Sequence, residues 1–148
     1  MKTLARARDL DEVRRRVRLL GPTHQPRWGR MSVHQAVCHL ADACRMALGE
    51  VEVPPLPPSA LRKLVALRLP VRWPSGLATR PEIDQFESGT RPAAFASDVQ
   101  TLLALVDRLA SEPSLHGRVH PVFGALSQDE WLRWGYLHLD HHLRQFGA

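Results

Sequence analysis

The chemistry that this sequence suggests lies in its histidines, three of which stand close together in the stretch HLDHH of residues 138–142. Residues four apart on an α-helix are rotated by only about 40° and have β-carbons about 6 Å apart. If this stretch is helical, His138 and His142 can therefore present imidazole nitrogens to one ion. His141 lies three residues from His138 and is an alternative to His142.

Spacing alone does not establish a site, because eight histidines in 148 residues give about 0.4 pairs four apart by chance. His116 and His120 form a second such pair. Gly117 and Pro121 interrupt that stretch, which we interpret as a loop. We expect replacement of either histidine to leave the metal site unchanged.

The sequence context favours the first pair. His138 and His142 continue the helical face of two tryptophans, a face expected to point into the core. A buried imidazole without a partner is costly. His39 stands among apolar residues of another expected helix and is the candidate third member. From these arguments, a shared metal site and three separately satisfied core histidines both remain open.

Apolar residues at spacings of three and four predict the helices that must position these side chains. We expect four long helices and one short one, at residues 9–20, 32–48, 91–110, 128–145 and 60–69. Ser127 and Glu130 have the spacing of a capping box before the last helix. Ser32 should cap the second helix, which Gly49 should end.

Each of the other two long helices has two candidate capping residues. Asp9 or Asp11 is expected to cap the first helix. Ser88 or Thr90 is expected to cap the helix at 91–110, with Pro92 tolerated in its first turn.

The segment between the second and third long helices is long and rich in proline, from residue 51 to about residue 90. Connections of this length are uncommon in compact domains, and we expect this one to cover one end of the helices. No segment alternates with period two for long enough to predict a sheet. The sequence therefore predicts one all-α domain over residues 1–148, a four-helix bundle with a long crossover and an extra short helix.

Composition limits where the protein works. No apolar run approaches the roughly 20 residues needed to span a bilayer, so we expect no membrane association. The N-terminus interrupts each apolar stretch with charge, unlike a secretory signal. Cys38 and Cys44 are expected to be reduced thiols. We therefore expect a cytoplasmic protein.

The net charge of +5 raises the question of nucleic-acid binding. Eighteen of the twenty basic residues are arginines, and they are spread along the chain among acidic residues. The first 27 residues also lack the Trp, Tyr and Phe side chains on which bases stack. We therefore regard a nucleic-acid binder as the least favoured class.

A histidine followed by leucine at positions 39 and 40, and then HLDHHLRQ at 138–145, resemble the DinB/YfiT-like superfamily of metal-dependent four-helix proteins. The terminal motif of that family has the form HxxxHRGQ. Here Arg144 and Gln145 are present, with the arginine shifted by one place. The stretches around these histidines resemble one branch of the superfamily more closely still.

The resemblance implies that the metal ligands are His39, His138 and His142. It leaves His141 as a substitute for His142 or an assistant to it, and His34 on the surface or behind the ligands. Zinc or nickel is the expected divalent ion, with iron as a further option. Asp42 and His141 are weak candidates for orienting ligands or moving a proton, and no catalytic residue is assigned.

Three imidazoles leave an open coordination position, unlike the filled set of a structural zinc site. The expected function is a metal-dependent hydrolase or thiol-dependent transferase acting on a small molecule. The alternative is a non-catalytic, stress-associated metal-binding protein whose ion ties two helices together. We also expect a homodimer, from the resemblance and from the number of long apolar stripes.

Overall fold

The computed structural model describes residues 1–69 and 72–148. These residues are mostly helical, as expected. They form α1 (Ala7–Leu19), α2 (Val33–Leu48), α3 (Ala60–Arg68), the 3₁₀ turn η1 (Pro81–Ile83), α4 (Phe95–Ser111), the strands β1 (Val119–His120) and β2 (Gly124–Ala125), and α5 (Gln128–Gln145).

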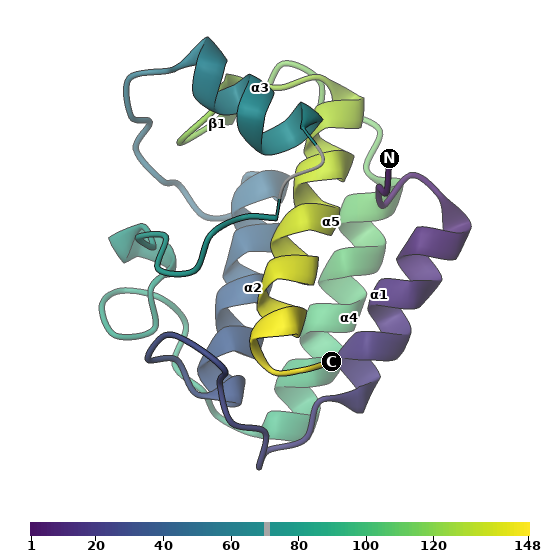
Figure 1. Cartoon of the computed structure of the whole chain (residues 1–148), viewed down its shortest axis with the longest axis vertical. Helices are drawn as coiled ribbons and strands as arrows, with labels where there is room; N and C mark the ends of the chain where they lie inside the picture. Colours follow the sequence, from purple (N-terminus) through teal and green to yellow (C-terminus); the bar gives the residue numbers. More distant parts are fainter. Residues whose placement is uncertain (70–71) are drawn as a thin grey trace.

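The four long helices α1, α2, α4 and α5 lie alongside one another (Figure 1). Helix α2 contacts α4 and α5, and α1 contacts the same two helices. Their apolar faces form a common core, which includes the fully buried Leu40, Leu102, Leu139 and Trp131. None of the described helices is both long and apolar enough to cross a membrane.

The crossover between α2 and α4 covers parts of this core from two directions. Helix α3 lies near β1 at one end of the long helices and contacts α5, whereas η1 lies against α2 (Figure 1). The segment therefore reaches both helices that carry the candidate ligands.

Several predicted helix ends are confirmed. Ser32 caps α2 and Ser127 caps α5, each in a reciprocal capping box with the residue three places later. Gly49 follows α2 with a left-handed φ of 80°, a conformation that glycine adopts without steric cost. The short helix predicted at 60–69 is α3, which ends one residue earlier.

The predicted start of α1 was wrong. The helix begins at Ala7, and neither Asp9 nor Asp11 is its N-cap. Asp9 instead lies in the first turn, where its carboxylate accepts a hydrogen bond from the backbone N–H of Thr3. That contact ties the preceding chain to the helix start, so the helix begins before the acidic residues rather than at them.

The predicted start of α4 was also wrong, because the helix begins at Phe95 and neither Ser88 nor Thr90 caps it. The hydroxyl and the N–H of Thr90 both donate to Asp42 on α2. Pro92 disfavours helical geometry in the residue before it and lies ahead of the helix. Thr90 therefore holds the crossover against α2.

A small antiparallel sheet corrects the expectation of no strands. Strands β1 and β2 pair His120 with Gly124 and Val119 with Ala125. Each strand has only two residues, too few to show a period-two pattern. The stretch HGRVHP, interpreted as loop, thus ends in a paired strand.

Candidate metal centre

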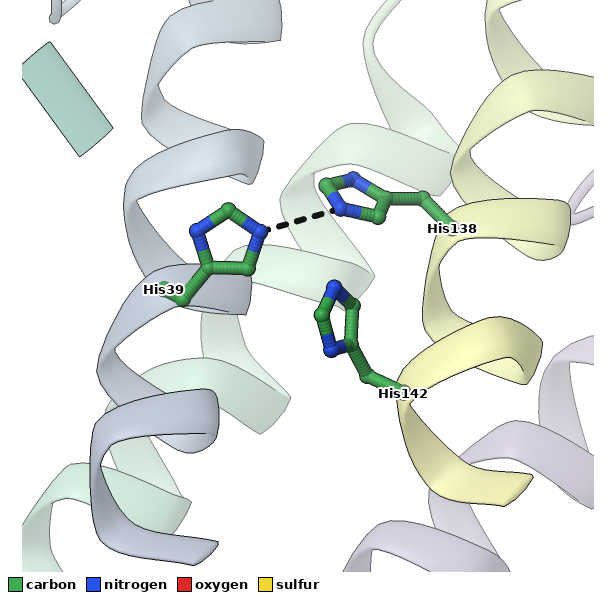
Figure 2. A group of neighbouring side chains, drawn as sticks. All are labelled: His39, His138 and His142. Atoms are coloured by element: carbon green, nitrogen blue, oxygen red, sulfur yellow. Dashed lines mark hydrogen bonds between the residues drawn. The ribbon is translucent and has the colours of Figure 1, made fainter. Parts of the chain in front are cut away.

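His39, His138 and His142 converge between two helices. His39 comes from α2, and the other two come from successive turns of α5, with all three rings facing the same space (Figure 2). One ligand nitrogen from each lies within 4.8 Å of the others. The Nε2 atoms of His39 and His138 are 3.1 Å apart. The structure thus brings together the three residues that the resemblance implied.

The ring of His39 is held by the crossover. Its Nδ1–H donates to the carbonyl oxygen of Ile83 in η1, at 2.8 Å. Because Nδ1 carries the proton, the Nε2 atom of neutral His39 has a lone pair, and it is this atom that is hydrogen-bonded to the Nε2 of His138. A second partner that fixes the tautomer in this way is typical of metal-ligating histidines.

Asp42, one turn after His39 on α2, holds the crossover that supplies this carbonyl. Its buried carboxylate accepts hydrogen bonds from Gln85, from the hydroxyl and N–H of Thr90, and from Arg45. The crossover is therefore fixed on both sides of residues 86–89. Asp42 is not one of the three clustered residues. It supports the site indirectly, because it holds the crossover segment whose Ile83 carbonyl binds His39.

His142 is oriented by the C-terminal end of its own helix. Its Nδ1 lies 2.8 Å from Oε1 of Gln145, while the amide Nε2–H of Gln145 donates to the carbonyl of Trp28 at 2.7 Å. Since the carbonyl of Trp28 can only accept, the amide oxygen of Gln145 faces His142 and accepts from its Nδ1–H. The Nε2 of His142 is then left with its lone pair.

Burial keeps the three rings neutral. His39 is buried, and burial lowers its pKa. Burial, together with repulsion from neighbouring imidazoles, lowers the pKa of His138 and His142 well below the ordinary value. Neutral imidazoles are the form that binds metal ions. The Nε2 lone pairs of His39 and His142 in one partly buried space fit a divalent ion.

His141 takes a different position. It is not in the three-histidine cluster, and its ring packs against Trp28, Trp73 and His142. Its Nδ1 is buried and has no hydrogen-bond partner among the described residues. The geometry favours His142 over His141 as the partner of His138.

His34 lies in a second cluster with Cys38 and Asp98, which joins α2 to the start of α4. The Nε2 of His34 is 2.6 Å from the Asp98 carboxylate, which also accepts from the N–H of Ala93. Burial and the Asp98 charge raise the pKa of the Cys38 thiol to about 11, so it stays protonated. This cluster is accounted for by its own hydrogen bonds.

His120 is a site neighbour that sequence reasoning missed. Its buried ring packs against Phe123, Trp131 and Trp134. The backbone N–H groups of Val122 and Phe123 point at its Nδ1, at 3.0 and 3.3 Å. Nδ1 therefore accepts, Nε2 carries the proton, and burial lowers the pKa of the ring to about 3.

The clustered histidines and His120 line one cavity of about 540 Å³. Its wall is formed by α2, α3, α5 and η1, together with segments 72–80 and 120–123. A cavity of this size matches typical small-molecule sites. The predicted ligands therefore lie where a small molecule can reach them.

Comparison with family models matches residues 4–146 to the model described as the DinB superfamily. The match includes all five helices described here. Comparison with curated proteins and with solved structures gave no significant match.

Proposed function

Since the chain belongs to the DinB superfamily, we propose that it is a four-helix-bundle metalloprotein, either a hydrolase or a thiol-dependent transferase for a small molecule. One divalent ion is held by His39, His138 and His142. The mutual packing of α1, α2, α4 and α5 supports the bundle assignment.

The observation that carries this proposal is the pair of fixed tautomers. Ile83 and Gln145 each occupy the Nδ1–H of one histidine. Both rings therefore direct an Nε2 lone pair into the space beside His138, where the Nε2 of His39 is hydrogen-bonded to the Nε2 of His138 (Figure 2). Two acceptor nitrogens and a third imidazole in one space are a donor set that suits a cation.

Zinc or nickel suits three imidazoles, and iron is a further option. A divalent ion bound by these three imidazoles would supply a Lewis acid for the reaction. The rings of Trp73 and Trp134 lie beside His138. His141 also lines the cavity and is available to accept or donate a proton there.

The composition of the cavity also favours a second candidate, a non-catalytic stress-associated metal-binding protein. None of the cavity-lining residues in the described part of the chain is Asp or Glu, so no carboxylate is present to act as a general base. The predicted ligands also join α2 to α5, so the ion would cross-link two core helices.

Metal analysis of the purified chain and of single-alanine variants tests the site. We expect about one divalent ion per wild-type chain. Replacement of His39, His138 or His142 should weaken binding by more than about 100-fold, because even loss of a supporting residue behind a ligand costs roughly 10–100-fold. Competition with a chromogenic chelator measures these affinities.

The matched controls are His141→Ala and His116→Ala, which should bind metal within about threefold of wild type. His116 is exposed and lies outside the cluster. A large loss of metal affinity in His141→Ala, with none in His142→Ala, would make His141 the ligand in place of His142. Absence of metal from every preparation would reject the site. Chelation that abolishes a hydrolytic or thiol-transfer activity while the helical signal is unchanged would favour the enzyme.

We further propose that the protein is a cytoplasmic homodimer. Its two cysteines are both free and buried, which suits a reducing compartment. Leu56, Leu64 and Leu69 expose apolar surface on the crossover, which supports self-association. Light scattering should give about twice the chain mass of 16.7 kDa; a monomer at high concentration would contradict the dimer.

A further inference from the structure

The cavity beside the three histidines has a mainly apolar wall. Leu61 and Val65 of α3, Phe123 of the short hairpin and Trp134 of α5 contribute to it. Trp73 is fixed there because its indole N–H donates to the carbonyl of Ala66, at 3.0 Å. Such a wall binds the hydrocarbon part of a ligand.

The charged residues of this cavity all have one sign. The lining includes Arg62, Arg72 and Arg80, and no acidic residue from the described part of the chain. Arg80 has a partner, since it lies 3.7 Å from Glu82 and donates to the carbonyl of Pro54. Within residues 1–69 and 72–148, no carboxylate pairs with Arg62 or Arg72.

These two arginines are exposed, in contrast to the histidines. They therefore lie at the mouth of the cavity, with the apolar wall and the predicted ligands inside. Most arginines on a protein surface are simply solvated. Two unpaired arginines on an apolar cavity that lacks any acid form a field that attracts anions, and guanidinium groups bind oxyanions in bidentate fashion.

We propose that the cavity binds a small amphipathic anion. Its oxyanion head, a carboxylate or a phosphate, pairs with Arg62 and Arg72, and its hydrocarbon body packs against Trp73, Phe123 and Trp134. The assignment of this ligand as the substrate rests on the proposed function, whereas its binding by the arginines does not depend on a metal.

Titration calorimetry with eight-carbon ligands that differ only in the head group tests this proposal. The probes are octanoate, octyl phosphate, octanol and octylammonium. Metal-free wild-type protein should bind octanoate or octyl phosphate at least about tenfold tighter than octanol, because one to two charge-assisted hydrogen bonds have an effect of this size. It should bind octylammonium most weakly. The two anions together distinguish a carboxylate site from a phosphate site.

The decisive variant is Arg62→Gln/Arg72→Gln, which should bind octanol as wild type does but lose the preference for anions. The control is Arg15→Gln/Arg18→Gln, which removes the same charge from exposed positions of α1 and should keep the preference. Circular dichroism verifies that both variants are folded.

Zinc titration of the same metal-free protein separates this inference from the proposed function. An arginine-dependent preference in protein that then takes up no zinc would support the anion site and reject the metal site. Equal affinity for octanoate, octyl phosphate and octanol would overturn the inference. A preference that appears only after zinc loading, or that survives in Arg62→Gln/Arg72→Gln, would overturn it as well, because the anion would then be held by another group.

Discussion

Gln145 shows how a single side chain distinguishes between two adjacent histidines. His141 and His142 are both within one helical turn of His138, so the spacing in the sequence permits either one. The amide of Gln145 binds the Nδ1 of His142 and the carbonyl of Trp28. Turning the amide over would place its NH₂ group against His142 and break both contacts. The orientation of His142 thus depends on the loop that contains Trp28.

Replacement of Gln145 by Ala should therefore weaken metal binding by roughly 10–100-fold, the usual effect of removing a partner behind a metal ligand. The lost acceptor leaves the His142 ring free to rotate and to change tautomer. Chelator competition measures the change, with Gln100→Ala on the exposed face of α4 as the control. Equal affinities in the two variants would show that Gln145 does not orient the ligand.

The sequence was enough to predict which histidines form the cluster, but not which residues surround them. His39 was identified because its helix face is apolar and because the His-Leu pair resembles a family pattern. His120 was missed because Gly117 and Pro121 indicate a loop, and local signals do not reveal that this loop folds over the tryptophans of α5. The support of His39 by Ile83 joins residues 44 positions apart, a distance that no helical period covers.

At the scale of elements, the long helices follow from local rules and the crossover does not. Ser32, Gly49 and Ser127 mark helix ends through contacts within a few residues. The start of α4 was wrong because Thr90 binds Asp42, which lies 48 residues away. The crossover contains few periodic apolar residues, and its position depends on contacts with distant parts of the chain, both these polar contacts with α2 and the burial of Leu67 and Ile83 in the core.

Asp42→Ala should destabilise the protein by about 2–4 kcal/mol, because the buried carboxylate accepts from several donors that would lose their partner. Metal affinity should fall as well, since η1 would no longer hold its carbonyl at His39. Urea unfolding of the metal-free protein gives the first quantity and chelator competition the second.

The control for this variant is Asp107→Ala on α4. The Asp107 side chain is 48% exposed and pairs with Arg14, so its loss should cost less than about 1 kcal/mol. Similar unfolding midpoints for the two variants would mean that Asp42 does not hold the crossover. A loss of stability in Asp42→Ala without any change in metal affinity would show that the crossover does not orient His39 for metal binding.

Over the whole molecule, the buried histidines make stability depend on pH. Burial lowers the pKa of five of them: His39, His120, His138, His141 and His142. In the unfolded chain each would titrate near the ordinary value of 6.5. Below that pH the unfolded chain binds more protons than the folded one, so the free energy of unfolding falls as the pH falls.

His120 isolates one part of this effect, because its pKa is lowered to about 3 and it is not in the three-histidine cluster. Between pH 6 and 5 it should contribute up to about 1.4 kcal/mol of lost stability per pH unit in metal-free protein. Urea unfolding at several pH values should therefore give a shallower slope for His120→Gln than for wild type, even though the variant is less stable at pH 7.5. His116→Gln, at an exposed position, should keep the wild-type slope. If His120→Gln kept that slope too, the ring would have to take up a proton in the folded protein, which would contradict its assignment as a neutral, buried imidazole.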